Sequence, residues 1–208
     1  MQKIKTIISA TAGGMLIALG AMTFLSAESR VIGALFFVIG LFTICTQGYF
    51  LYTGRICYVW ENDRNYLIDT LLIWFGNFAG CFIAAKLILL TRFGGAITER
   101  AAVLAEMKLG DNLLSIFILA VFCNICIYIA VEGFNKNPHE LGKYLALIIG
   151  VMVFILCGFE HCIANMFYIS AAGMWSGKAL VFILINTLGN TVGGWLLPMA
   201  KKVMGSPK

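Results

Sequence analysis

Residues 158–168 read GFEHCIANMFY and place Glu160 beside His161 within an apolar stretch that runs from Tyr144 to Gly173. Glu160 is the only Asp, Glu, Lys or Arg between Lys143 and Lys178. A carboxylate at the centre of a bilayer costs on the order of 2.5–3.5 kcal/mol on insertion scales, so such residues are rare and usually functional. The Glu160–His161 pair is therefore the first candidate for a functional centre.

The composition of the chain is that of a membrane protein. Of its 208 residues, 61% are hydrophobic and 12% are charged, whereas soluble domains are about 45–50% apolar and about 25% charged. The net charge of +5 is modest. No basic run is interleaved with aromatic residues, which argues against a nucleic-acid partner. The composition predicts a multi-pass protein whose main partner is the lipid bilayer.

Six apolar segments predict an all-α integral membrane protein with six transmembrane helices. Each segment can cross a hydrocarbon core about 30 Å thick, and the fifth is long enough to be tilted or broken. A signal peptide is a poor alternative for the first, because five more apolar segments follow it. The segments are Ile7–Ala27, Val31–Gly54, Leu67–Leu90, Leu113–Val131, Tyr144–Gly173 and Ala179–Ala200.

An even number of spans places both termini on one side of the membrane. With the termini inside, nine of the 15 Lys and Arg residues fall on the cytoplasmic side, which favours cytoplasmic termini and an inner-membrane location. Residues 92–112 interrupt the apolar pattern. Within them, Thr98 to Leu109 predict a short amphipathic helix on the outer surface, with Lys108 near its end.

Two halves of the chain resemble each other. Gly76-Asn77-x-x-Gly80 recurs as Gly189-Asn190-x-x-Gly193, and a polar interruption falls in the second and in the fifth apolar segment. With three spans in each half, the second half is inserted upside down, a plan common among channels and transporters. We therefore predict one domain, 1–208, with inverted three-helix repeats at about 5–91 and 112–202 and with broken second and fifth helices.

The interrupted segments resemble the signature of the formate/nitrite transporter family. The resemblance rests on GFEHCIANM at 158–166, LYTG at 51–54, GNFAG at 76–80, FCN at 122–124 and GNTVGG at 189–194. It implies a homopentamer of aquaporin-like protomers, each with its own pore. The chain departs from the family in one respect: only Met1 to Thr6 precede the first apolar segment, so we predict a pore without the family's N-terminal gating segment.

The resemblance assigns roles to single residues of this sequence. His161 corresponds to the central histidine, and Lys108 to a lysine of the outer vestibule. Phe37 and Leu41 correspond to a cytoplasmic constriction, and Ile127 and Phe154 to an outer one. The remaining residues expected along the substrate pathway are Thr53, Asn124, Glu160 and Asn190.

These residues suggest how an anion would cross. Stripping a small anion of its water in an apolar constriction is costly, so we expect it to cross with a proton. Lys108 would concentrate the anion, and His161 would donate a hydrogen bond or a proton. A structural role for Glu160 or Asn124, and a plain surface role for Lys108, remain open alternatives.

Formate is the expected substrate, since Ile127 and Phe154 suit a very small anion, and nitrite or hydrosulfide is the alternative. A non-transporting membrane scaffold is the rival of another class. An enzyme, a cofactor and a metal site are not expected. The chain has only two histidines, and Cys123-x-x-Cys126 has no second cysteine pair near it.

Overall fold

The computed structural model describes residues 2–205, so Met1 and Lys208 of the predicted terminal segments lie outside the described residues. This part of the chain is helical and contains no β-strand. In chain order the helices are α1 (Gln2–Ser26), α2 (Arg30–Gln47), α3 (Tyr52–Arg55), the 3-10 helix η1 (Ile56–Glu61), α4 (Arg64–Leu89), α5 (Gly94–Leu109), α6 (Leu113–Lys136), α7 (Glu140–Leu156), α8 (Cys162–Ala172) and α9 (Gly177–Met204).

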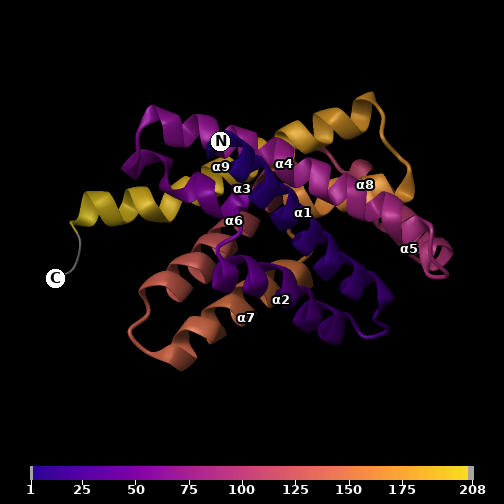
Figure 1. The fold of residues 1–208 in the computed structure, drawn as a ribbon, viewed down its shortest axis with the longest axis horizontal. Coiled ribbons are helices and arrows are strands. Elements are labelled where there is room, and N and C mark those ends of the chain that lie inside the picture. The colour runs from indigo at the N-terminus through magenta and orange to yellow at the C-terminus, as the bar shows by residue number, and fades with distance from the viewer. Residues whose placement is uncertain (1, 206–208) are drawn as a thin grey trace.

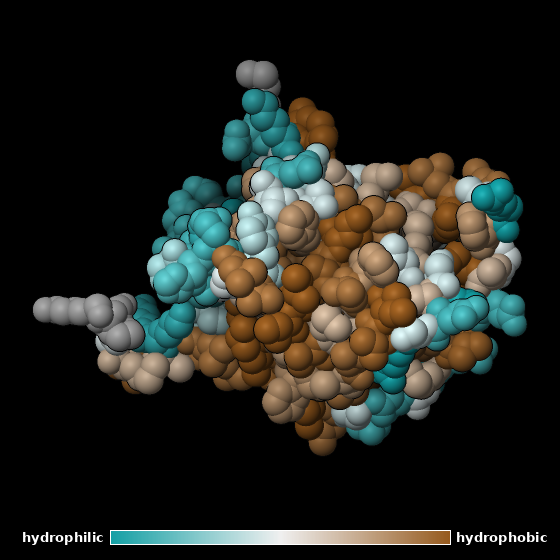
Figure 2. Space-filling model, turned by 90° about the horizontal axis from the view of Figure 1, so that it is seen from below, coloured by the Kyte–Doolittle hydropathy of each residue, from teal (hydrophilic) through white to brown (hydrophobic). Residues whose placement is uncertain are grey.

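Within residues 2–205, five helices are long and apolar enough to cross a membrane, namely α1, α2, α4, α6 and α9, and α8 is a shorter apolar helix. The second predicted span corresponds to α2 and α3 with the residues between them. The fifth corresponds to α7 and α8. Figure 2 shows hydrophobic residues across the middle of one face and hydrophilic residues gathered at its two ends. This distribution suits a protein surrounded by lipid.

The helices pack as two similar groups. Helix α1 lies against α2 and α4, and α6 lies against α7 and α9. The groups meet where α2 contacts α7 and where α4 contacts α8. In Figure 1, α5 and the α1–α2 connection lie at one end of the long axis, and η1 and the end of α9 lie at the other. The core between the groups holds the residues of the candidate site.

Small residues let the long helices of each group approach closely. A Cβ atom added to Gly80 of α4 would lie 2.0 Å from the carbonyl oxygen of Thr11. One added to Gly193 of α9 would lie 2.1 Å from the carbonyl oxygen of Val121. These contacts account for the last glycine of each Gly-Asn-x-x-Gly pattern, since only a residue without a side chain fits there.

The chain leaves the helical path at two matching places. Gly48 ends α2 with φ 74°, and Gly158 follows α7 with φ 71°, in the left-handed region that favours glycine. Four residues after each glycine, a new helix begins: Leu51 is the N-cap residue of α3, and His161 is that of α8. Residues 110 positions apart therefore occupy the same place in the two interruptions.

An asparagine supports the backbone of the first interruption. The side-chain oxygen of Asn77 accepts a hydrogen bond from the backbone N–H of Tyr52 at 2.8 Å. Its amide nitrogen donates to the carbonyl oxygens of Phe50 and Ala10 at 2.9 and 2.7 Å. Buried backbone groups need such partners, and the side chain of Asn77 supplies them where the helix cannot.

Asn190 makes the corresponding bonds at the second interruption. Its oxygen accepts from the backbone N–H of Cys162 at 2.9 Å. Its nitrogen donates to the carbonyl oxygens of Glu160 and Ala120, both at 2.8 Å. Asn190 thus holds the backbone around the candidate centre.

The helix predicted at Thr98–Leu109 is present as part of α5, with Glu99, Arg100 and Glu106 exposed. Its other face packs against α8 and buries Ala101, Ala105 and Lys108. The burial of Lys108 was not expected, and it is possible because Lys108 has a charged partner there.

Candidate functional site

His161 lies at the centre of the site and is 2% exposed. Its Nδ1 accepts a hydrogen bond from the backbone N–H of Ala164 at 3.2 Å, which caps α8. Its Nε2 lies 3.1 Å from the hydroxyl oxygen of Thr53 on α3. The ring stacks on Phe154 with the centroids 5.6 Å apart. Because Nδ1 is an acceptor, the neutral ring carries its proton on Nε2.

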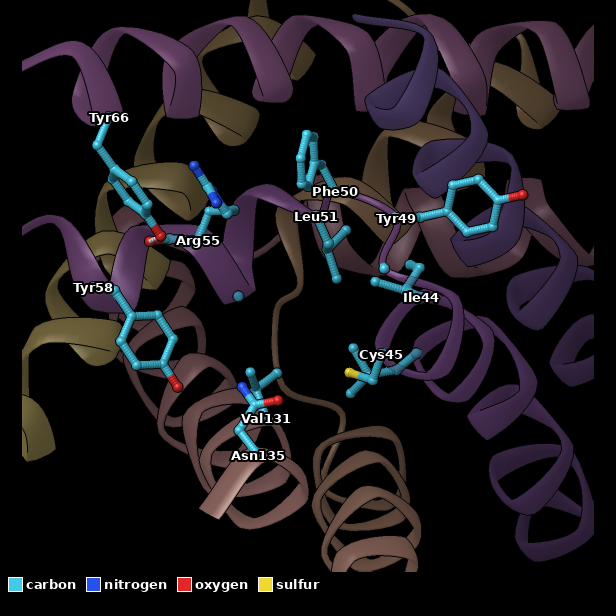
Figure 3. A pocket seen from close by; sticks show the side chains of 13 residues that line it. Ile44, Cys45, Tyr49, Phe50, Leu51, Arg55, Tyr58, Tyr66, Val131 and Asn135 are labelled. Atoms are coloured by element: carbon cyan, nitrogen blue, oxygen red, sulfur yellow. Dashed lines mark hydrogen bonds between the residues drawn. The ribbon is translucent and has the colours of Figure 1, made fainter. Parts of the chain in front are cut away.

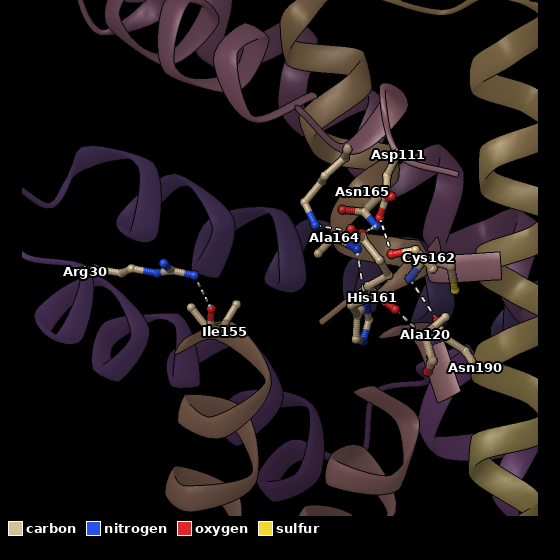
Figure 4. Close-up of polar contacts among 12 residues, drawn as sticks. Arg30, Asp111, Ala120, Ile155, His161, Cys162, Ala164, Asn165 and Asn190 are labelled. Atoms are coloured by element: carbon tan, nitrogen blue, oxygen red, sulfur yellow. Dashed lines mark hydrogen bonds and ion pairs between the residues drawn. The ribbon is translucent and has the colours of Figure 1, made fainter. Parts of the chain in front are cut away.

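Glu160 forms a buried charged cluster next to His161. Its carboxylate oxygen Oε2 accepts from the ammonium group of Lys108 and from the side-chain amide of Asn165, both at 2.6 Å. The side chains of Lys108 and Glu160 are only 8% and 4% exposed. Figure 4 shows Asn165, Cys162 and Asn190 gathered around His161. The charge of Lys108 is thus compensated within the protein.

Thr53 and Asn124 meet on the other side of His161. The amide nitrogen of Asn124 donates to the backbone carbonyl of Thr53 at 3.1 Å. The side-chain oxygen of Asn124 is buried and has no hydrogen-bond partner within residues 2–205. Asn124 therefore bonds to α3, which carries Thr53, and its own side-chain oxygen stays available as a hydrogen-bond acceptor.

The four residues expected at constrictions are all buried. The ring of Phe37, expected at the cytoplasmic constriction, meets that of Phe154, expected at the outer one, edge-on with the centroids 5.7 Å apart. Leu41 lines a cavity on the far side of Thr53. Ile127 is buried and lines neither of the two cavities described next.

Two cavities approach His161 and Thr53 from opposite sides. The Lys108 cavity, of about 50 Å³, borders Lys108, Phe154, His161 and Asn165. The Arg55 cavity, of about 270 Å³, is lined by Leu41, Leu51, Gly54 and Arg55 among others (Figure 3). No residue lines both. Because His161 lines the Lys108 cavity and Gly54, next to Thr53 in the chain, lines the Arg55 cavity, the His161–Thr53 contact lies in the layer between them.

Sequence reasoning missed three residues of the site. Asn165 and Leu51 lie inside the quoted motifs but were given no role, although Asn165, a polar residue in an apolar stretch, is itself a signal. Arg55, directly after LYTG, was counted only for membrane orientation. The sequence carried no signal for the pairing of Lys108 with Glu160, which are 52 positions apart.

The described residues contain no group of three or more His, Cys, Asp or Glu side chains that could hold a metal ion. The seven cysteines are free thiols, and Cys123 and Cys126 are buried in α6. The polar groups of the site are arranged for hydrogen bonding around a buried imidazole.

Known proteins with similar sequences are channels and transporters. The formate channel FocB of Escherichia coli K12 is 29% identical over 82% of this chain and 67% of its own length. The formate channel BtFdhC of Bacillus thuringiensis is 30% identical over 79% and 69%. The uncharacterized transporter YrhG of Bacillus subtilis is 30% identical over 80% and 68%.

Solved structures share the fold. A pentameric formate channel with formate bound superposes with a TM-score of 0.79 at 23% identity, over 98% of this chain and 97% of that one. A structure described as an FNT family ion channel reaches a TM-score of 0.85 at 20% identity, over 98% of this chain and 91% of that one. Residues 1–203 match the sequence profile described as formate/nitrite transporter. The chain is a multi-pass membrane protein, and it belongs to the formate/nitrite transporter family.

Proposed function

We propose that this protein is a channel for small monovalent weak-acid anions, with formate as the expected substrate, and that each anion crosses together with a proton. Nitrite and hydrosulfide are the alternative substrates of the same pathway. The similarity to proteins named formate channels supports formate.

One observation carries the proposal: His161 lies between two cavities and presents Nε2 toward Thr53, which belongs to the other interrupted helix. A hydrogen-bond donor in this position can hold a carboxylate or carboxylic acid while it passes between the cavities. The free side-chain oxygen of Asn124 adds an acceptor close to the same layer. An O–H group of a protonated acid needs such an acceptor.

Apolar side chains on both sides of His161 favour a neutral species. Phe37 and Phe154 form an aromatic contact on the side of the Lys108 cavity, and Leu41 and Leu51 border the Arg55 cavity. Burying an unpaired charge among such groups costs far more than burying a neutral polar molecule. In the proposed cycle, formate takes up a proton on the side where it enters, crosses as formic acid and releases the proton on the other side.

The geometry favours His161 as a hydrogen-bond donor rather than the source of that proton. A second proton would have to sit on Nδ1, where it would face the N–H of Ala164. Loss of the single proton on Nε2 would leave a negatively charged ring in an apolar site, which is unfavourable. The proton of the cycle therefore comes from water on the side where the anion enters.

In the proposed mechanism, the ion pair of Lys108 and Glu160 positions His161. Their charges compensate each other at 2.6 Å, and Glu160 precedes His161 in the chain. The pair also keeps a positive group on the wall of the Lys108 cavity, where it can attract an anion locally.

We further propose six membrane crossings in two inverted three-helix repeats, with the second and fifth crossings broken. The matching contacts of Asn77 and Asn190 support this arrangement. Cytoplasmic termini, an inner-membrane location and a homopentamer are parts of the same proposal. The similarity of the fold to a formate channel that is itself pentameric supports the last of these.

Flux measurements test the function. Proteoliposomes containing the purified protein and a pH-sensitive dye inside should acidify when formate is added outside, faster than empty liposomes do. Parallel runs with nitrite and hydrosulfide rank the substrates. Flux no faster than in empty liposomes for all three would instead support a non-transporting scaffold.

A further inference from the structure

The Arg55 cavity contains a cation that the proposed mechanism does not use. Arg55 lies at the end of α3, and its guanidinium carbon is 3.8 Å from the ring centroid of Tyr66 and 5.1 Å from that of Phe50. Figure 3 shows Arg55 and Tyr66 side by side at this cavity. Stacking on aromatic rings fixes the plane of a guanidinium group without using its N–H donors.

Arg55 has no anionic partner in the described chain. None of the ion pairs formed within residues 2–205 includes it. Its Nε is buried and makes no hydrogen bond within the same residues. The carboxylate of Glu132 receives a hydrogen bond from Tyr58, which also lines the cavity, but it is paired with Lys136 and Lys201. A buried donor without a partner points to a ligand that brings an acceptor.

The two cavities are built from matching positions of the two halves. Lining residues 110 positions apart include Gly48 and Gly158, Leu51 and His161, and Arg55 and Asn165. By the same spacing, Phe50 takes the place of Glu160. In the Lys108 cavity a carboxylate of the protein satisfies the donors of Lys108 and Asn165. In the Arg55 cavity the phenyl ring of Phe50 takes the place of that carboxylate. The N–H donors of Arg55 are therefore available to an anion from outside the protein.

We propose that Arg55 forms a second anion-binding site, separate from His161, that binds a small planar monocarboxylate such as formate. The guanidinium fork offers two parallel N–H donors that match the two oxygens of a carboxylate. The cavity continues to Leu41 and Leu51, next to the layer that contains His161 and Thr53. An anion on Arg55 is therefore held at one mouth of the pathway. The identity of the ligand rests on the proposed function, but binding can be tested without transport.

The direct test is formate binding to the full-length protein in detergent, measured by saturation-transfer NMR with isotopically labelled formate. The measurements use a His161→Phe background, which removes the central donor and lowers the proposed transport. In this background we expect formate to bind, and Arg55→Gln to weaken its binding about tenfold or more. Arg55→Lys keeps the charge but loses the planar fork, so its affinity for formate should lie between that of the background protein and that of the Arg55→Gln variant.

Arg64→Gln is the matched control, because Arg64 is an exposed arginine at the start of α4 that does not line the cavity. It should leave formate binding unchanged. Equal losses from Arg64→Gln and Arg55→Gln would overturn the proposal, because they would show a general effect of charge. Unchanged binding after Arg55→Gln would overturn it too.

A second binding measurement, with phosphatidylglycerol, distinguishes formate from a lipid headgroup as the ligand of Arg55. If Arg55→Gln leaves formate binding intact but abolishes binding of phosphatidylglycerol, Arg55 is a lipid anchor and the proposal is wrong. Formate binding that depends on Arg55 in a protein that shows no flux would uphold this site and refute only the proposed function. Gel filtration of each variant establishes that the fold and assembly are retained.

Discussion

Replacing His161 with Phe tests the central role of the imidazole. Phe keeps the aromatic contact with Phe154 but removes both ring nitrogens. Without Nε2 the carbonyl oxygen of neutral formic acid would cross without a donor, and leaving a buried acceptor unsatisfied costs about 1–3 kcal/mol. At about 1.4 kcal/mol per factor of ten, formate flux should fall roughly fivefold to hundredfold.

The same substitution also affects folding, and this effect can be separated. Loss of Nδ1 leaves the N–H of Ala164 without its cap, at a cost of about 1 kcal/mol in stability. His161→Asn is the matched variant, because asparagine is a good N-cap but its short side chain does not replace the Nε2 donor. We expect both variants to lose flux, and only His161→Phe to lose thermal stability through the missing cap.

The assay is stopped-flow acidification of proteoliposomes at matched protein density, with the oligomer checked by gel filtration. A well-assembled His161→Phe protein with the flux of the unmodified protein would refute the reasoning. It would show that the imidazole only caps α8 and fills space.

Three further predictions concern the surrounding residues. Lys108→Met should lower the free energy of unfolding by about 3–5 kcal/mol, because it leaves Glu160 charged and unpaired. Adding Glu160→Gln should restore much of this loss, as measured by thermal unfolding. Equal stability of the single and double variants would contradict this prediction. Phe154→Ala should open the aromatic contact and raise acetate and lactate flux relative to formate flux, and an unchanged ratio would exclude a constriction there. Gly80→Ala should impair assembly, because its Cβ would lie 2.0 Å from a carbonyl oxygen of α1. Gly95→Ala is the control and should be neutral, because no atom lies within 4 Å of its added Cβ. Gel filtration compares the assembly of the two variants.

The sequence determined the class of the protein and the location of its centre. Long apolar segments require helices in a bilayer, because backbone groups must be satisfied within each segment. A carboxylate next to a histidine in such a segment is costly, so Glu160 and His161 stood out without any structure. The paired Gly-Asn-x-x-Gly patterns indicated two related halves, and the structure shows Asn77 and Asn190 making corresponding hydrogen bonds in them.

The tertiary structure decided which side chains meet. Lys108 was expected to be a lysine of the outer vestibule, and it is buried against Glu160. Phe37 and Phe154 were assigned to different constrictions, and their rings are in contact. Arg55 was only a charge in a loop, and it lines a cavity without an anionic partner in the described chain. Helical periodicity and hydrophobicity are local properties, whereas these pairings depend on how helices far apart in the chain are turned toward one another, and that follows only from packing the whole bundle.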